Sequence, residues 1–166
     1  MQEAKIRLAT VTPLMLGGAD QRGPAELRSP PFRGGMRYWF RAALGGVIGD
    51  DNLEGLHRLE GLVFGSPERG SPITVRIRPN QDLNHARVYI LPHKNRGRRD
   101  AIDAGETFEI VISQTRSSGD ETLDTLIWIN ACMAFNLMVL FGGVGLRSRR
   151  GYGSLRTMAS TLKLIV

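Results

Sequence analysis

The amino-acid sequence predicts a single α+β domain in which two long helices are separated by extended segments. Three observations support this: short segments with period-2 alternation, two segments with helical periodicity, and a length of 166 residues, enough for one core. The expected order is strand, helix, strands, helix, strand. That order is the ferredoxin-like βαββαβ pattern with insertions, and no repeat or low-complexity linker divides residues 1–166.

The first half of the chain is expected to hold one strand and two helices. Residues 5–11 are extended in character, and residues 12–20 form a loop. Pro30 and Pro31 suit the first turn of a helix that ends at glycines 45, 46 and 49. A shorter helix is expected at 51–64. The apolar face of the first helix repeats at helical spacing: Met36, Trp39, Phe40, Ala43, Leu44 and Val47.

The second half is expected to hold most of the strands. Residues 73–78 and 107–113 alternate apolar and polar side chains, as half-buried strands do, and 87–91 indicate another short strand. Residues 92–105 are expected to form a long basic loop. The final strand is expected at 154–166.

The second long helix has a predicted start and an unusual composition. Ser118 and Glu121 fit a capping box, so a helix is expected from there to about Phe141. Its second half is apolar nearly all round, which indicates that it is either deeply buried or covered by a partner.

Charge is unevenly distributed and points to an anionic partner. The net charge is +6 and the pI is about 10.2, and arginine supplies nearly all of the basic residues. Residues 87–99 hold five basic side chains and no acid, whereas residues 100–124 hold seven acids and one arginine. Arginine excess fits phosphate recognition or a GC-rich genome equally well, and the segregation by sign favours a basic surface.

Residues 142–155 are the most informative segment, with five glycines, three arginines, two serines and no acid. Glycines permit positive φ, exposed amides form anion-binding concavities, and arginine adds forked donors that match phosphate. The alternative is an elaborate helix C-cap, but a cap needs one or two glycines and no arginine. This glycine-rich loop is therefore expected to hold a phosphodiester backbone.

Two further basic segments are candidates for the same partner. Arg33, Arg37 and Arg41 recur every four residues and form one stripe, which is either a solvated helix edge or a surface facing RNA. Tyr38, beside this stripe, is a candidate for stacking on a base. Residues 92–99 are either a mobile loop or one that folds around a nucleic-acid backbone. Its basic members are Lys94, Arg96, Arg98 and Arg99.

Catalysis is considered as an alternative. His57, His85 and His93 show no metal-ligand spacing, and neither a metal nor a cofactor is expected. An RNA endonuclease would use His93 as a general base on a ribose 2′-hydroxyl, or Asp20 to place a metal or water at a phosphate. The simpler interpretation of Asp20 is a turn residue or helix cap.

The expected location is cytoplasmic, without a membrane partner. Cys132 is the only cysteine, which indicates a reducing compartment, and no charged-then-apolar leader opens the sequence. The longest apolar stretch, 126–141, is short for a bilayer span and contains Asn130 and Asn136.

Residues 12–20, 26–41 and 64–66, together with the glycine-rich loop, resemble the RAMP superfamily of CRISPR-associated proteins, and within it the first-subunit family of the Cmr (type III-B) effector complex. The resemblance implies a ferredoxin-like fold and a non-cleaving place near the 3′ end of CRISPR RNA, with target RNA and other RAMP or Cmr-type subunits as partners. Family members commonly carry two such domains, and this chain has room for one. The RNA contacts implied are Arg33, Arg37, Arg41, Gly17, Gly18, Gly145, Arg147, Ser148, Arg149 and Arg150.

Three functions remain open at this point: an RNA-holding subunit, an RNA endonuclease, and a scaffold that contacts other subunits through the apolar helix at 126–141.

Overall fold

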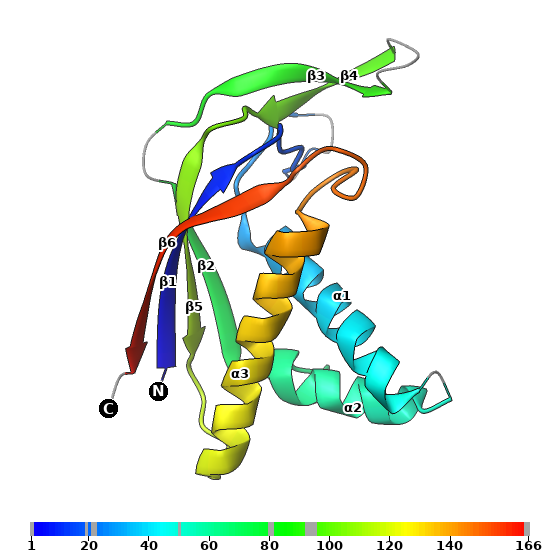
Figure 1. Cartoon of the computed structure of the whole chain (residues 1–166), viewed down its shortest axis with the longest axis vertical. Coiled ribbons are helices and arrows are strands. Elements are labelled where there is room, and N and C mark those ends of the chain that lie inside the picture. Colours follow the sequence, from blue (N-terminus) through cyan, green and yellow to red (C-terminus); the bar gives the residue numbers. More distant parts are fainter. Residues whose placement is uncertain are drawn as a thin grey trace.

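The computed structural model describes residues 2–18, 20, 23–49, 51–79, 82–91 and 96–164. A four-stranded antiparallel sheet carries the helices on one face, and a two-stranded hairpin extends from one end of the sheet (Figure 1). The elements are β1 (Gln2–Thr10), α1 (Ser29–Ile48), α2 (Leu53–Phe64), β2 (Ile73–Pro79), β3 (His85–Leu91), β4 (Arg96–Ile102), β5 (Thr107–Gln114), α3 (Glu121–Leu137), a π-helical turn (Met138–Gly142) and β6 (Leu155–Leu164).

The sheet order confirms the ferredoxin-like prediction. The strands lie in the order β2-β5-β1-β6, and every neighbouring pair is antiparallel. Two strand–helix–strand units, β1–α1–β2 and β5–α3–β6, therefore interleave within one sheet. Helix α2 is inserted after α1, and the β3–β4 hairpin is inserted between β2 and β5.

The core lies between the sheet and the helices. In the register, Ile6 of β1 is opposite Ile110 of β5, and the alternating apolar residues of both strands face the helices. Phe32 of α1 packs edge-on against Phe108 with ring centroids 5.7 Å apart. Val47, expected on the apolar face of α1, is 83% exposed because the helix extends past the core at its C-terminal end.

Helix α1 is longer than the glycines predicted. It runs through Gly45 and Gly46 to Ile48 and ends at Gly49, whose φ is 92° and whose N–H donates to the Gly45 carbonyl at 3.0 Å. The prediction that all three glycines end the helix was wrong for the first two. A glycine lowers helix stability by only about 1 kcal/mol relative to alanine, and packing against α2 and α3 outweighs that cost.

Helix α3 begins at a different cap from the one predicted. Asp120, not Ser118, is the N-cap, and its carboxylate accepts hydrogen bonds from the N–H groups of Thr122 and Leu123. Ser118 instead donates its hydroxyl hydrogen to the Asp120 carbonyl at 3.0 Å. Aspartate accepts hydrogen bonds at an N-cap as well as serine does. Asp120, which directly precedes the first helical residue, therefore caps the helix in place of Ser118.

The apolar second half of this helix is buried on one side only. Ala131 and Phe135 belong to the core, whereas Leu140 and Phe141 in the π-helical turn are 72% and 66% exposed. By length and composition alone, the stretch Glu121–Gly142 is apolar enough to cross a membrane, and its buried side chains pack into the same core as the sheet.

Residues 92–105 were predicted to be a loop, and that prediction was wrong for residues 96–102. Residues 96–102 form β4, which pairs antiparallel with β3, so that Arg87 lies opposite Asp100. An isolated bridge between Leu14 and Ile102 fastens the base of this hairpin to the chain after β1. Residues 96–100 carry no apolar side chain, and the two buried residues of β4, Ala101 and Ile102, are adjacent at the base of the hairpin, so the segment gave no period-2 signal.

Candidate nucleic-acid interface

The glycine-rich loop has a backbone that only its glycines permit. Positive φ angles occur at Gly143, Gly145, Arg147, Gly151 and Gly153. A Cβ atom at Gly145 would overlap the Met15 carbonyl oxygen, and one at Gly153 would overlap the Val144 carbonyl oxygen. Arg147 adopts a φ of 59°, a conformation that a non-glycine residue rarely takes. Such strained positions concentrate at functional sites.

The loop encloses a concave, basic surface. Gly145, Arg147, Ser148, Arg149 and Arg150 line a hollow of about 300 Å³. Within the described part of the chain, no hydrogen bond engages the backbone N–H groups of Arg147 and Arg149. The Nε atom of Arg147 is buried and has no hydrogen-bond partner there either. Free amides in a curved loop beside three guanidinium groups are the donor set that an anion needs.

The chain that follows β1 holds this loop in place. The N–H of Leu146 donates to the Met15 carbonyl, and the N–H of Gly153 donates to the Pro13 carbonyl, both at 2.9 Å. Gly17 and Gly18, predicted to line the same groove, therefore come directly after the segment 13–15, whose carbonyl groups hold the loop. A Cβ at Gly18 would collide with the carboxylate of Glu26, an acid that the sequence gave no reason to place there.

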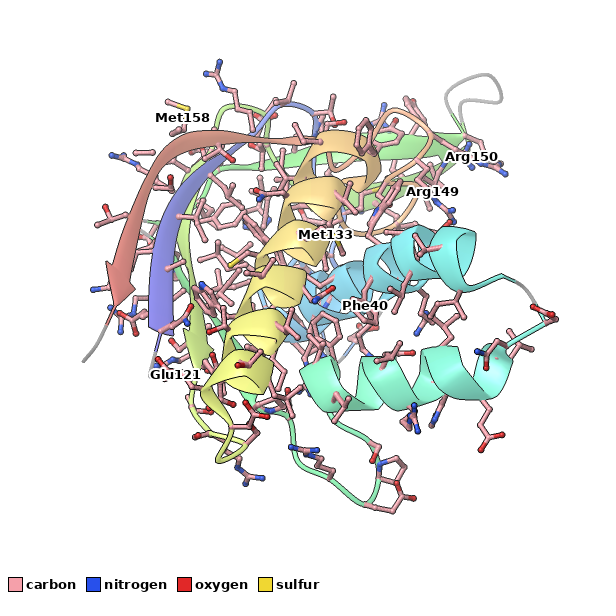
Figure 2. The ribbon with its side chains drawn as sticks, turned by 60° about the horizontal axis from the view of Figure 1, so that its bottom comes forward. Phe40, Glu121, Met133, Arg149, Arg150 and Met158 are labelled. Carbon is pink, nitrogen blue, oxygen red and sulfur yellow. The ribbon has the colours of Figure 1, made fainter. Side chains whose placement is uncertain are left out.

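Arg149 joins the loop to helix α1. Its Nη1 donates to the Tyr38 hydroxyl oxygen at 2.6 Å, and its guanidinium lies over the Tyr38 ring, 4.8 Å from the centroid. Figure 2 shows Arg149 and Arg150 projecting beside α1. Tyr38 follows Arg37 in this helix, but consecutive helical residues point in different directions, so this contact places the loop against α1 without placing Arg149 beside Arg37.

The β3–β4 hairpin reaches the same loop. The Tyr152 hydroxyl donates to the Tyr89 carbonyl at 2.7 Å. Arg98 lies over the Tyr89 ring, 4.6 Å from its centroid, and donates to the Tyr89 hydroxyl oxygen at 2.7 Å. Arg98 thus extends the basic surface along β4, whereas Arg99, the next residue of the strand, faces the opposite side of the hairpin. His93 and Lys94 lie outside the described residues, and only the backbone of Arg96 is described.

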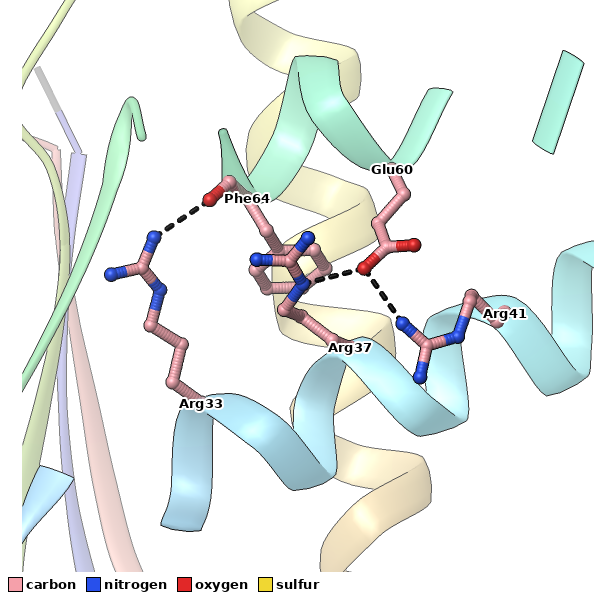
Figure 3. A network of polar contacts seen from close by, with 5 residues as sticks. All are labelled: Arg33, Arg37, Arg41, Glu60 and Phe64. Atoms are coloured by element: carbon pink, nitrogen blue, oxygen red, sulfur yellow. Dashed lines mark hydrogen bonds and ion pairs between the residues drawn. The ribbon is translucent and has the colours of Figure 1, made fainter. Parts of the chain in front are cut away.

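The arginine stripe of α1 has protein partners that the sequence did not foresee (Figure 3). Glu60 of α2 is 4% exposed and accepts from Arg37 Nε at 2.5 Å and from Arg41 Nη1 at 2.8 Å. Arg33 Nη2 donates to the Phe64 carbonyl at 2.7 Å. The stripe therefore packs towards α2 and fastens two helices together, and its contacts with RNA stay a prediction.

Of the two candidate catalytic residues, Asp20 is described by the structure and His93 lies outside the described residues. Asp20 is exposed, and its carbonyl accepts from the Gly23 N–H at 3.2 Å, which suits a turn residue. Among the described residues, no group of three or more His, Cys, Asp and Glu side chains is arranged to hold a metal ion. The endonuclease assignment of Asp20 and His93 gains no support from the described geometry and stays an alternative.

One histidine forms an ion pair that sequence reasoning missed. His85 Nδ1 lies 2.6 Å from Asp100 Oδ2, and the same carboxylate accepts from the Ala25 N–H at 2.7 Å. Partial burial opposes ionisation, but the hydrogen bonds from Ala25 and His85 outweigh it and hold the pKa of Asp100 below its usual value. The pair joins the two strands of the hairpin and fixes the chain before α1.

Other contributors to this surface also carried little sequence signal. Glu60 lies 23 residues after Arg37, with the rest of α1, a loop and the first part of α2 between them, so no spacing rule relates the two residues. Tyr89 and Tyr152 are single aromatic residues in a strand and a loop. The basic residues near them in the sequence are the one local signal that could have indicated a place on this surface.

An antiparallel ferredoxin-like sheet with a glycine- and arginine-rich loop before its last strand defines a class of protein. The RAMP superfamily model matches residues 7–156, so the chain belongs to the RAMP superfamily. It is similar to the Cmr subunit Cmr1-2 of Pyrococcus furiosus, at 32% identity over 94% of this chain and 95% of the relative. It is also similar to Cmr1-1 of that organism, at 28% identity over 84% of this chain and 43% of the relative.

Solved structures of Cmr subunits have the same fold as this chain. The crystal structure of Cmr1 from Pyrococcus furiosus matches with a TM-score of 0.72 and 25% identity, over 97% of this chain and 50% of that one. A chain of the type III-B Cmr-β complex bound to cognate target RNA has the same fold, with a TM-score of 0.72 at 14% identity. The chain thus spans nearly all of Cmr1-2 but only about half of Cmr1-1 and of the solved Cmr1.

Proposed function

We propose that this chain is an RNA-binding subunit of a type III CRISPR effector, and that it holds the backbone of the CRISPR RNA in its 3′ region. The observation that carries the proposal is the concave loop of Gly145, Arg147, Ser148, Arg149 and Arg150, with its free amides. The similarity to Cmr1 subunits supports the choice of complex, since a related chain lies in an assembly bound to target RNA.

Binding of this kind is mainly electrostatic. Amides and guanidinium groups contact phosphates, which are the same in every nucleotide, so affinity depends weakly on sequence and strongly on salt. The aromatic Tyr38, 42% exposed beside Arg149, is placed to stack on a base. Other RAMP or Cmr-type subunits are the expected neighbours, since the chain is similar to Cmr1 subunits.

The proposal is tested by removing the charge of the loop. The triple variant Arg147→Ala, Arg149→Ala and Arg150→Ala is titrated with labelled single-stranded RNA by filter binding across a range of salt concentrations. The logarithm of the binding constant falls as the logarithm of the salt concentration rises. Loss of three phosphate contacts should make this negative slope shallower by about 2, at about 0.7 for each contact.

The matched control removes the same charge elsewhere. Arg58, Arg69 and Arg116 are exposed and lie outside the loop, the hairpin and the stripe, so their triple alanine variant should keep most of the slope. Equal losses in the two triple variants would mean that net charge alone attracts RNA. Unchanged binding in the loop variant would overturn the proposal.

A further inference from the structure

A second basic hollow lies between the start of helix α1 and the edge strand β2. This open cleft of about 680 Å³ is larger than the hollow of the glycine-rich loop. Among the described residues, no acid lines it, and Ser29, Ser71 and Thr74 share the lining with two arginines. The described lining residues are Ser29, Pro30, Arg33, Gly34, Arg37, Ser71, Ile73, Thr74 and Val75.

The two arginines keep donors that the protein does not use. Arg33 Nη2 is engaged by the Phe64 carbonyl, but its Nε is buried and has no hydrogen-bond partner in the described part of the chain. Arg37 pairs with Glu60 through Nε only. Three arginines and one glutamate leave the stripe with a charge of +2. Because Pro30 and Pro31 have no N–H, these guanidinium groups and not the helix terminus are the main donors towards the cleft.

Gly34, on the wall of this cleft, has no packing reason to be a glycine. A Cβ at its neighbour Gly35 would strike Met138, so that position must stay small. A Cβ at Gly34 would meet nothing within 4 Å. Gly46 of the same helix is equally open, but Gly34 lines the cleft, so at Gly34 the missing side chain leaves room for a ligand to approach the helix backbone closely.

The cleft and the loop adjoin across α1. Gly34 and Tyr38 are four residues apart and share one face of the helix, separated by about 6 Å along its axis. Tyr38 holds Arg149 of the loop, so a polyanion lying on the loop would reach Gly34 within about one helical turn.

We propose that the RNA strand held by the glycine-rich loop continues over Tyr38 and Gly34 into the α1–β2 cleft, where Arg33 and Arg37 bind a second phosphate group. This inference rests on the proposed function. It adds a second anchor and a direction: the strand crosses α1 towards the free edge of β2. Two anchors on one strand bind it more tightly than either alone, provided that the strand is long enough to reach both.

The first test is a length series. Oligouridylates of about 4 to about 16 nucleotides are titrated into the wild-type chain and into Arg33→Gln. The wild type should gain affinity steeply once both anchors are spanned, whereas Arg33→Gln should lose that step, bind the longest oligonucleotides about tenfold more weakly, and show a salt slope lower by about 0.7. An Arg33→Gln curve that follows the wild type at every length would overturn the second anchor.

The second test avoids any effect on folding. Gly34→Ala adds a methyl group into open space, so it should raise the melting temperature by roughly 2 °C and still weaken binding of the longer RNA. Gly46→Ala is the matched control, because it also adds a methyl group where nothing lies within 4 Å but sits three turns further along α1. Gly46→Ala should gain stability without losing affinity. Equal RNA affinity in the two variants would show that no strand approaches Gly34.

The outcomes separate the two proposals. If the loop triple variant loses RNA and the Arg33→Gln and Gly34→Ala variants do not, the cleft is not a nucleic-acid site, and the proposed function stands without it. If the loop variant also keeps its RNA, both proposals fail.

Discussion

The Glu60 network gives a prediction in which stability and RNA binding move in opposite directions. Glu60 is nearly inaccessible to solvent and accepts charge-assisted hydrogen bonds from Arg37 and Arg41 (Figure 3). Glu60→Gln keeps the shape and one carbonyl acceptor but removes the negative charge. The two arginines then lose their counter-ion, and the stripe of α1 gains one unit of positive charge.

The size of the effect follows from burial and geometry. A hydrogen bond to a charged group contributes about 1.5–3 kcal/mol, against about 1 kcal/mol for a neutral one. The arginine side chains are 36% and 45% exposed, so solvent screens part of this difference. About 1 kcal/mol for each bond gives a loss of about 2 kcal/mol. For a domain of this size, that lowers the melting temperature by about 4–8 °C.

The assay is thermal and urea unfolding, with circular dichroism as the signal. The same protein preparations are also titrated with RNA. Glu54→Gln is the control, because Glu54 is exposed in the first turn of α2 and should change stability by about 0.5 kcal/mol. RNA affinity of Glu60→Gln should equal or exceed that of the wild type, with a salt slope steeper by about 0.7 if the freed arginines reach RNA. A stability within about 0.5 kcal/mol of the wild type would refute the role given to this network.

Three further predictions concern the loop, the hairpin and the core. Gly153→Ala should destabilise the domain by more than 1 kcal/mol, because φ is positive and a Cβ would overlap the Val144 carbonyl; urea unfolding measures this, and a neutral effect would contradict the described loop. The lowered pKa of Asp100 means that its ionised form stabilises the fold above the ordinary value of 3.8, and that this contribution is lost as pH falls through the lower folded value. Asp100→Asn should therefore be less stable than the wild type near neutral pH, and the difference in stability should shrink as the pH falls below 3.8; a difference that does not shrink in acid would contradict the role given to this carboxylate. Burial raises the pKa of the Cys132 thiol to about 11, so alkylation near neutral pH should be slow in the native chain and fast in urea; equal rates would refute the burial.

Features set by local sequence were predicted well. The alternation at 73–78 and 107–113 gave two sheet strands, because a side chain on a pleated strand faces the core at every second position. The helical repeat of Met36 and Phe40 placed α1 against the sheet for a similar reason. The glycine-rich loop was recognised because positive φ and close backbone approach leave few alternatives to glycine.

Features that depend on distant partners were not predicted. Arg37 and Arg41 looked like a free basic stripe, since nothing in their spacing reveals a buried glutamate on another helix. Residues 96–102 looked like a loop because 96–100 carry no apolar side chain and the buried pair Ala101 and Ile102 is too short to show an alternation. The endpoints of helix α1 were misjudged because tertiary packing outweighs the small cost of two glycines.

The sequence by itself determined the order of strands and helices apart from β4, the position of the apolar faces, and the loop of glycine and arginine that is suited to phosphate. These follow from local backbone and side-chain chemistry, which acts over a few residues. Only the tertiary structure decided that Arg149 contacts Tyr38 and that Glu60 accepts hydrogen bonds from the arginine stripe of α1. It also decided that Arg33 and Gly34 line an open cleft. Those relations depend on how the sheet and helices pack, and residues separated by twenty to more than a hundred positions carry no local signal of their contact.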